Sequence, residues 1–168
     1  MSTSSKNYFK LVNYIKSNQD KFYRVAYSYT KSKEDALDIV QESVYKGLKS
    51  VHTLKKDKYM ATWFYRILIN TSITYYKKAS VIQLTPHIDE EGYVSPYQSA
   101  DYVDLYTAID ELSAEDRGII ILRYFEDQKI KDIAQIMDIN ENTLKTRLYK
   151  ILRQLKEELA CEVIDDDY

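Results

Sequence analysis

Apolar residues recur at helical spacing along most of the first 80 positions. Two N-terminal stretches carry them three and four residues apart, namely Tyr8, Leu11, Val12 and Ile15, then Phe22, Val25, Ala26 and Tyr29. A third segment begins at Glu34, with the apolar stripe Ala36, Ile39, Val40, Val44 and Leu48. A fourth is predicted from near Ala61 to Lys78. The pattern thus predicts four helices.

The helical pattern stops after the fourth segment. Between Val81 and Asp101 no period is sustained, both prolines occur, and Gly92 follows three acidic residues. Periodicity resumes at Asp104 and continues through residues 105–112, 119–122, 130–137 and 144–159. Only 3 Gly and 2 Pro supply too little turn chemistry for a many-stranded sheet. We therefore expect an all-α fold of two small helical domains joined by an irregular linker.

Charge follows the same division, which a net charge of −2 conceals. Residues 1–80 carry 15 Lys and Arg against 6 Asp and Glu, whereas residues 81–116 carry 9 acidic residues and no basic ones. Residues 117–156 carry 9 basic against 5 acidic residues, and residues 157–168 add 6 acidic ones. Two basic blocks separated by an acidic one favour two anion-binding modules. The expected parts are a domain at 1–80, an acidic linker at 81–103, a domain at 104–162 and an acidic tail at 163–168.

Several functional classes are disfavoured by what the chain lacks. No apolar run approaches the roughly 18 residues that span a bilayer, and Met1–Lys10 has no secretory stretch, so a cytoplasmic protein is expected. The single cysteine, Cys161, and the distant His52 and His87 argue against a disulfide or a zinc site. Neither a nucleophile–base pair nor a Gly-rich phosphate loop is evident. We expect no enzyme, no metal and no cofactor.

A helix-turn-helix is predicted in the second domain. Asp138-Ile139-Asn140 separates a short helix, 130–137, from a long one beginning at Glu141, and three residues is the spacing of this motif. Asn140 is a good N-cap for the second helix. Asp138 occupies the position that needs a left-handed conformation, which Asp tolerates better than most residues.

The second helix of this motif presents a polar face. Its inward stripe is Leu144, Leu148, Ile151 and Leu155, and its outward donors and cations are Asn142, Lys145, Thr146, Arg147, Tyr149, Lys150 and Arg153. Such a helix can read base edges in a major groove and hold phosphates. A helical hairpin with a solvated basic face is an equally good interpretation of the spacing alone.

The third segment of the first domain also has a polar face. Asp38, Gln41, Glu42 and Tyr45 recur at i, i+3, i+4 and i+7. Helical di-metal sites pair Glu with a His three residues on, and no such pair exists here. The face is either a docking surface for a basic partner or ordinary solvated charge.

The fourth segment combines an aromatic residue with amides and cations. One side carries Trp63, Arg66, Asn70, Thr74 and Lys77, and another carries Phe64, Ile67, Leu68, Thr71 and Tyr75. Rings and amides of this kind suit unstacked bases. The upstream lysines 46, 49, 55, 56 and 58 could follow the nucleic-acid backbone. The alternative is a core tryptophan with solvated lysines.

Three stretches of this chain resemble the conserved regions of extracytoplasmic-function (ECF) sigma factors of the sigma-70 family. Residues 34–43 (EDALDIVQES) resemble region 2.2, which docks on the β′ clamp helices of RNA polymerase, and residues 61–70 (ATWFYRILIN) resemble regions 2.3 and 2.4, which melt and read the minus-ten element. Residues 111–126 and 133–147 resemble region 4, whose helix-turn-helix reads the minus-thirty-five element. The resemblance implies a sigma region 2 bundle at 1–80 and a region 4 domain at 104–162.

This resemblance also implies roles for individual residues. Minus-ten contacts are implied for Trp63, Arg66, Asn70, Thr74 and Lys77. Minus-thirty-five contacts are implied for Asn142, Thr143, Lys145, Thr146, Tyr149 and Lys150, with Arg147 as a backbone or structural arginine. Polymerase docking is implied for Asp35, Asp38, Gln41 and Glu42. The chain departs from the family pattern at three places: Asp138 replaces the frequent glycine, Ser113-Ala114 replaces a Pro-containing turn, and Thr74 stands where Asn or Asp is frequent. The last two departures mean that the promoter sequence cannot be predicted from the family's rules.

Partners and rivals complete the expectation. The chain looks most similar to the envelope-stress group typified by sigma-V, which implies core polymerase, promoter DNA and a membrane-anchored anti-sigma factor as partners, and a place at the inner face of the membrane. The main alternative is a stand-alone helix-turn-helix regulator, dimeric on two half-sites roughly one helical turn apart. A pure interaction protein, such as an anti-sigma antagonist, and a small helical enzyme are further rivals.

Overall fold

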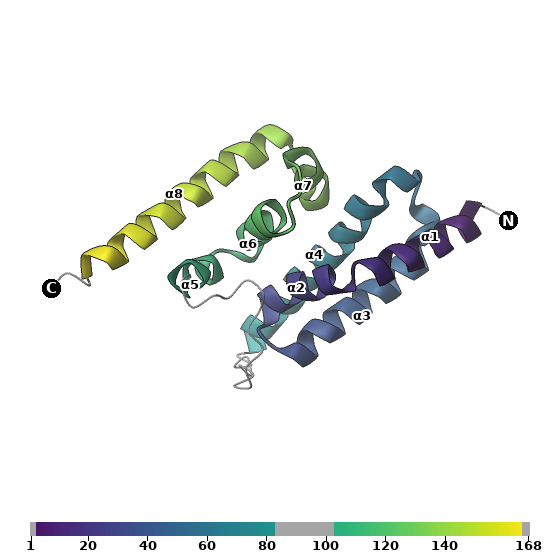
Figure 1. Ribbon diagram of the computed structural model, residues 1–168, viewed down its shortest axis with the longest axis horizontal. Coiled ribbons are helices and arrows are strands. Elements are labelled where there is room, and N and C mark those ends of the chain that lie inside the picture. Colours follow the sequence, from purple (N-terminus) through teal and green to yellow (C-terminus); the bar gives the residue numbers. More distant parts are fainter. Residues whose placement is uncertain (1–2, 83–102, 166–168) are drawn as a thin grey trace. The chain divides into compact units, whose positions relative to one another are not determined.

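The computed structural model describes residues 3–82 and 103–165, with side chains from 5–82 and 104–160. These residues form two compact units, one on each side of residues 83–102. Every regular element in the described part of the chain is helical, which confirms the all-α prediction (Figure 1). Most of the expected linker, 81–103, lies outside the described residues. Its ends do not, since Val81, Ile82 and Val103 are helical.

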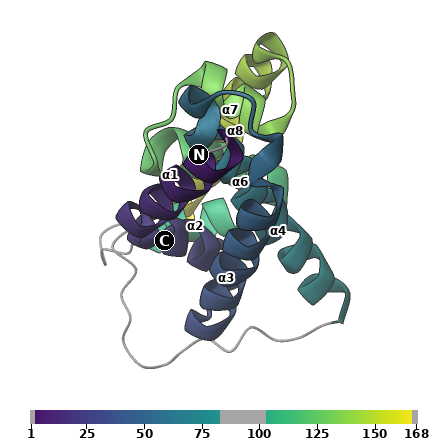
Figure 2. The ribbon, with the colours of Figure 1, turned by 90° about the vertical axis from the view of Figure 1, so that its right-hand side faces the viewer.

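Unit 1 consists of four α-helices and two short 3-10 turns. The elements are α1 (Thr3–Ser17), α2 (Gln19–Thr30), α3 (Lys33–Ser50), η1 (Val51–Thr53), η2 (Asp57–Tyr59) and α4 (Met60–Ile82). Helix α4 therefore extends four residues beyond the predicted end at Lys78. Helix α3 packs against both α2 and α4, and Figure 2 shows α1 and α3 running side by side.

Aromatic rings form the centre of unit 1. The rings of Phe22 and Phe64 are fully buried with centroids 4.8 Å apart, and Tyr65 meets Phe22 edge-on at 5.6 Å. Leu11, Ile39, Leu68 and Ile69 of the same unit are also inaccessible to solvent. Burial of such large apolar side chains is the main driving force for folding a bundle of this size.

The buried stripe of α3 differs from the predicted one. Ala36 and Ile39 are buried as expected, but the stripe continues through Ser43 and Gly47, whereas Val40, Val44 and Leu48 are only half-buried. The reason is close packing: a Cβ at position 47 would lie 3.0 Å from Cε2 of Phe64. Only small side chains fit where α3 approaches α4.

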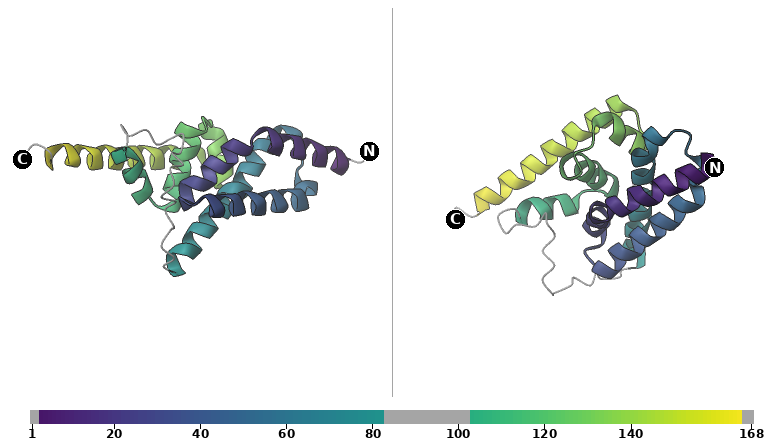
Figure 3. Two further views of the ribbon diagram at one scale, coloured as in Figure 1. Left: turned by 60° about the horizontal axis from the view of Figure 1, so that its bottom comes forward. Right: turned by 45° about the vertical axis from the view of Figure 1, so that its right-hand side comes forward.

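Unit 2 consists of α5 (Val103–Glu111), α6 (Ala114–Ile120), the π-helical turn η4 (Ile121–Phe125), α7 (Ile130–Met137) and α8 (Glu141–Asp165). Helix α8 packs against α5, α6 and α7 and runs unbroken along the unit (Figure 3). Its helical backbone continues three residues into the expected tail, 163–168. The largest fully buried side chains of the unit are Ile119, Leu122, Ile133, Ile136, Leu144 and Ile151.

Serine side chains cap the starts of α3 and α6. The Ser32 hydroxyl accepts a hydrogen bond from the Asp35 N–H at 3.3 Å, and the Ser113 hydroxyl accepts one from the Asp116 N–H at 3.2 Å. Each cap satisfies a backbone donor that the first helical turn leaves open. Within the described ranges, no helix has the length and apolar character needed to cross a membrane.

Candidate nucleic-acid and protein interfaces

The turn between α7 and α8 has the geometry expected of a helix-turn-helix. Asp138 ends α7 in the left-handed conformation, with φ 56° and ψ 45°, and the Ile139 N–H donates to the Ala134 carbonyl at 3.0 Å. Asn140 caps α8, because its Oδ1 accepts the Asn142 N–H at 2.8 Å. The predictions for Asp138 and Asn140 are confirmed. The turn fixes where α8 begins, and so which residues occupy its first turns.

Helix α8 separates into a buried side and an exposed side. The predicted inward stripe, Leu144, Leu148, Ile151 and Leu155, is buried throughout. The exposed side includes nearly all the predicted donors and cations, namely Asn142, Thr143, Lys145, Thr146, Tyr149, Lys150 and Arg153. The Tyr149 ring is 72% exposed, so it is open to a partner.

Arg147 is placed differently from the other predicted residues of α8. Its Nε donates to Oδ1 of Asp116 at 2.5 Å, and the two side chains are 36% and 23% exposed. The pair joins α8 to the first turn of α6. Of the two roles that the resemblance implies for Arg147, this contact supports the structural one. A pair separated by 31 residues has no signal in local sequence patterns.

One side of α4 carries the five residues predicted for a nucleic-acid strand. Arg66, Asn70, Thr74 and Lys77 are exposed and Trp63 is half-buried, while Phe64, Leu68 and Thr71 are buried on the other side. Tyr65 and Ile69 are also buried, so α4 buries a wider surface than its predicted stripe. The exposed side is thus a polar strip with one ring at its N-terminal end.

The polar side of α3 contains the predicted docking residues. Asp38, Gln41 and Glu42 are exposed, and Asp35 is half-buried at the first turn. Desolvation raises the pKa of the Tyr75 phenol on α4 to about 12, helped by a hydrogen bond with Asp35 and by the negative charges of Asp35 and Asp38. Tyr75 therefore stays neutral and connects α4 to the acidic side of α3.

Lys46 makes a second connection between α3 and α4. Its Nζ lies 2.7 Å from Oε1 of Glu42 and donates to Oγ1 of Thr71 at 3.3 Å. Other predicted backbone-following lysines lie near exposed rings, with Lys49 Nζ 5.8 Å from the Tyr45 centroid and Lys58 Nζ 4.9 Å from that of Tyr59. Lys55 and Lys56 are exposed.

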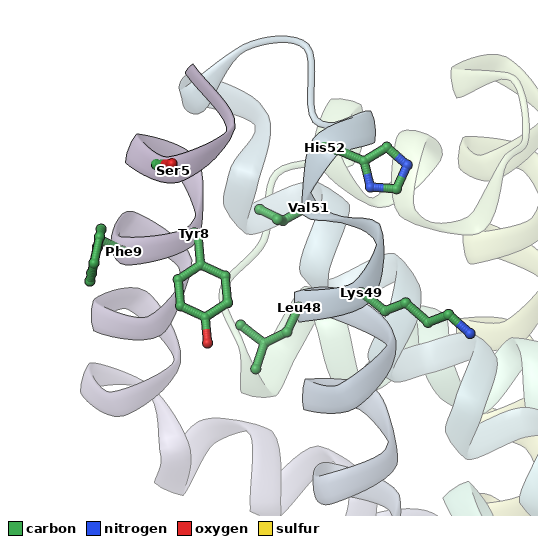
Figure 4. A pocket seen from close by; sticks show the side chains of 7 residues that line it. All are labelled: Ser5, Tyr8, Phe9, Leu48, Lys49, Val51 and His52. Carbon is green, nitrogen blue, oxygen red and sulfur yellow. The ribbon is translucent and has the colours of Figure 1, made fainter. Parts of the chain in front are cut away.

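A pocket that the sequence did not predict lies between α1 and the end of α3. It has a volume of about 380 Å³ and is lined by Ser5, Tyr8, Phe9, Leu48, Lys49, Val51 and His52. Figure 4 shows the Tyr8 ring between the two helices and Phe9 pointing away from α3. Exposed rings and a cation therefore also occur on the α1 side of unit 1.

Metal ligation has no candidate among the described side chains, where no group of three or more His, Cys, Asp or Glu residues is positioned to hold an ion. His52 is exposed beside the pocket. His87 and Cys161 lie outside the described side chains.

Comparison with known proteins assigns the family. The Sigma-70 region 2 model matches residues 14–81, and the Sigma-70, region 4 model matches residues 102–155. RNA polymerase sigma factor SigV of Bacillus subtilis is 42% identical over 156 residues, which cover 90% of this chain and 92% of that protein. The chain belongs to the sigma-70 family of RNA polymerase sigma factors. Within the family it is an ECF sigma factor, and the B. subtilis ECF sigma factor SigX is 25% identical over 86% of this chain and 82% of its own.

Solved structures share the fold of this sigma factor. The sigma factor RpoE of Bartonella quintana, in complex with the anti-sigma factor NepR, has a TM-score of 0.67 at 22% identity, over 88% of this chain and 95% of its own. CnrH, in complex with the cytosolic domain of CnrY, has a TM-score of 0.70 at 13% identity, over 94% of this chain and 95% of its own. Both similarities confirm the helical two-domain architecture.

Family membership decides between the rival interpretations. As a sigma factor, the chain binds core RNA polymerase and directs it to promoter DNA in transcription initiation, in a family of non-enzymatic initiation factors. The expectation of an ECF sigma factor is confirmed, and the stand-alone regulator is not favoured.

Proposed function

We propose that this sigma factor divides promoter recognition and polymerase docking among three defined surfaces. The strand face is Trp63, Arg66, Asn70, Thr74 and Lys77 of α4, which holds the melted minus-ten strand. The recognition face is Asn142, Thr143, Lys145, Thr146, Tyr149 and Lys150 of α8, which reads the minus-thirty-five duplex. The docking face is Asp35, Asp38, Gln41 and Glu42 of α3, which contacts the polymerase β′ clamp helices.

The observation that carries the proposal is the two-sidedness of α4. Its buried side anchors the helix in unit 1, and its other side keeps Asn70 and Thr74 exposed, one turn apart. An unstacked base needs a planar surface and hydrogen-bonding groups, which Trp63 and the Asn70 amide supply. Arg66 and Lys77 add charge for the phosphates.

The recognition face is suited to duplex DNA. In helix-turn-helix proteins the N-terminal residues of the second helix reach base edges, and later residues reach phosphates. Lys145 and Lys150 are exposed cations on α8, and Tyr149 adds an exposed ring between them in sequence. Arg147 is assigned a positioning role, because its ion pair with Asp116 holds α8 against α6.

The docking face is suited to a basic protein surface. Asp38, Gln41 and Glu42 are exposed, and Asp35 is half-buried. Asp35, Asp38 and Glu42 are carboxylates, whereas the Gln41 amide can donate and accept hydrogen bonds. Charge complementarity between two proteins speeds their association and fixes how their surfaces are aligned.

We also propose control by a membrane-anchored anti-sigma factor in an envelope-stress response. The support is the 42% identity to SigV and the occurrence of two similar folds in complexes with CnrY and the anti-sigma factor NepR. This control would hold the protein at the inner face of the membrane until release. The assignment of 1–80 and 104–162 as the two functional domains, with 81–103 as linker, belongs to the same proposal.

Binding of a promoter fork probe, double-stranded upstream and single-stranded at the minus-ten element, tests these assignments. The probe comes from the promoter upstream of the protein's own gene, and affinity is measured with and without core polymerase. Tight binding should require core polymerase, and Asn70→Ala should lower the affinity of the complex about tenfold, given the roughly 1–3 kcal/mol that a bidentate side-chain contact to a base contributes. Lys78→Ala, on α4 but outside the strand face, is the control. Tight binding to a palindromic duplex without polymerase would contradict the proposal.

A further inference from the structure

Helix α1 holds the segment that connects α3 to α4. The buried Asn7 side chain donates from Nδ2 to the Leu54 carbonyl at 3.4 Å, and the Lys10 ammonium donates to Oδ2 of Asp57. Asn7 and Lys10 lie three residues apart on one side of α1, and their two partners are also three residues apart. The two contacts together attach residues 54–59, the anchored loop, to α1.

Buried apolar side chains hold both ends of this segment. Val51 and Leu54 are 5% and 6% exposed, and Met60, the first residue of α4, is 7% exposed. All the side chains between Leu54 and Met60 are exposed. The buried residues therefore fix where the backbone of the anchored loop lies, and its side chains extend into solvent.

Asp57 is an isolated negative charge in a basic stretch. Between positions 43 and 88 it is the only acidic residue, whereas eight Lys and Arg residues occur there. Three of these eight are exposed in the anchored loop itself, namely Lys55, Lys56 and Lys58. An unpaired carboxylate among them would repel phosphates and compete for the lysines. Lys10 neutralises this carboxylate from α1.

The anchored loop lies at the N-terminal end of the strand face. Its last turn, η2, contacts α4 and leads directly into it at Met60. Trp63, the first residue of the strand face, is in the first turn of α4, and Asn70 follows about two turns later. A strand held at the Trp63 ring therefore has its next phosphates beside the anchored loop.

We propose that Asn7 and Lys10 are positioning residues, which hold the anchored loop so that its three lysines contact phosphates of the melted strand beyond Trp63. This inference rests on the proposed role of the strand face. The Sigma-70 region 2 model begins at residue 14, so both positioning residues lie before the matched part of the chain. Because the Lys10 and Asp57 side chains are 54% and 46% exposed, water screens their ion pair, which contributes little to the stability of unit 1.

Affinity for the promoter fork probe, measured with core polymerase at low salt, separates positioning from charge. If Asp57 acted through its charge alone, Asp57→Asn would raise affinity, because it removes a negative charge near the strand. We expect Asp57→Asn to lower affinity roughly two- to fivefold, since the pair can bias the loop by no more than the interaction of one exposed ion pair. Asp20→Asn, which removes an exposed carboxylate from α2, is the matched control and should cause no loss.

Reversal of the ion pair gives a second test. Asp57→Lys brings two cations together and should lower affinity, although it adds a positive charge to the loop. Lys10→Glu in the Asp57→Lys background should restore affinity, because it re-forms the pair in the opposite direction. A pure charge effect has the opposite sign at both steps. Thermal melting and affinity for core polymerase without the probe should match the wild type in every variant.

The outcomes separate this inference from the proposed function. Unchanged or higher affinity in Asp57→Asn, or a Lys10→Glu change that fails to restore Asp57→Lys, would overturn the positioning role even if Asn70→Ala still weakens binding. Probe binding that ignores Asn70→Ala but falls in Asp57→Asn would overturn the strand face while supporting the anchored loop as a nucleic-acid contact.

Discussion

Tyr75 shows how one side chain can join two surfaces. Its hydroxyl is hydrogen-bonded with Asp35, the half-buried member of the docking face, and it follows Thr74 of the strand face in the chain. Sequence periodicity predicted its place on the apolar side of α4 but not its polar contact. That contact depends on how α3 and α4 pack, which local spacing does not encode.

The raised pKa of Tyr75 predicts a specific loss of stability at alkaline pH. A tyrosine in the unfolded chain loses its proton near pH 10, whereas folded Tyr75 keeps it to about pH 12. The folded state then binds more protons, so the stability that Tyr75 provides is complete below about pH 10 and falls as pH rises toward 12. The difference in unfolding free energy between the wild type and Tyr75→Phe should shrink over this window, as measured by urea unfolding at several pH values.

Comparison of the two proteins cancels the titration of the other 16 of the 17 tyrosines. A difference that stays constant from about pH 9 to about pH 11.5 would show that folding does not raise the pKa of Tyr75.

At the scale of elements, the contact of α3 with α4 depends on the absence of a side chain. Gly47 faces Phe64, which is fully buried and packed against Phe22, so the ring has no space to retreat. The sequence did not reveal this contact, because Ser43 and Gly47 do not register as apolar positions. Small residues that permit close helix approach are visible only once the partner helix is in place.

Gly47→Ala should therefore destabilise unit 1, although alanine favours helix. The gain in helix propensity is about 1 kcal/mol, while overpacking a tight core costs about 1–3 kcal/mol, so we expect a net loss of about 1 kcal/mol. Phe64→Leu makes room, and the Gly47→Ala/Phe64→Leu double mutant should lose less stability than the sum of the single mutants. The stability of the wild type, the two single mutants and the double mutant is measured from the midpoints of urea unfolding. A stabilising Gly47→Ala would refute the packing argument.

Helix boundaries, by contrast, were largely predictable. The turn residues Asp138 and Asn140 and the buried stripe of α8 follow from capping chemistry, left-handed tolerance and a 3.6-residue period. These signals are local and strong. Contacts between helices were not predictable in this way. The ion pair of Arg147 with Asp116 and the hydrogen bond from Lys46, the partner of Glu42, to Thr71 depend on how the helices pack.

For the whole molecule, the charge pattern and the order of the motifs together anticipated the family. A basic block, an acidic block and a second basic block match a protein with two DNA-binding units, and each described unit presents at least one exposed polar helix face. The sequence did not separate structural from functional cations on those faces. By residue type Arg147 could have either role, and its ion pair with Asp116 favours the structural one.

Run-off transcription tests the account most directly. Core RNA polymerase is assayed with and without this protein on the promoter upstream of its own gene, using wild type, Asn70→Ala, Lys145→Ala/Lys150→Ala and the control Lys156→Ala, exposed on α8 outside the recognition face. We predict a discrete new transcript that requires the protein, falls about fivefold or more in both surface variants and persists in the control, since each variant removes contacts of about 1–3 kcal/mol. A transcript that is unaffected by both surface variants would contradict the assignment of α4 and α8 to promoter recognition.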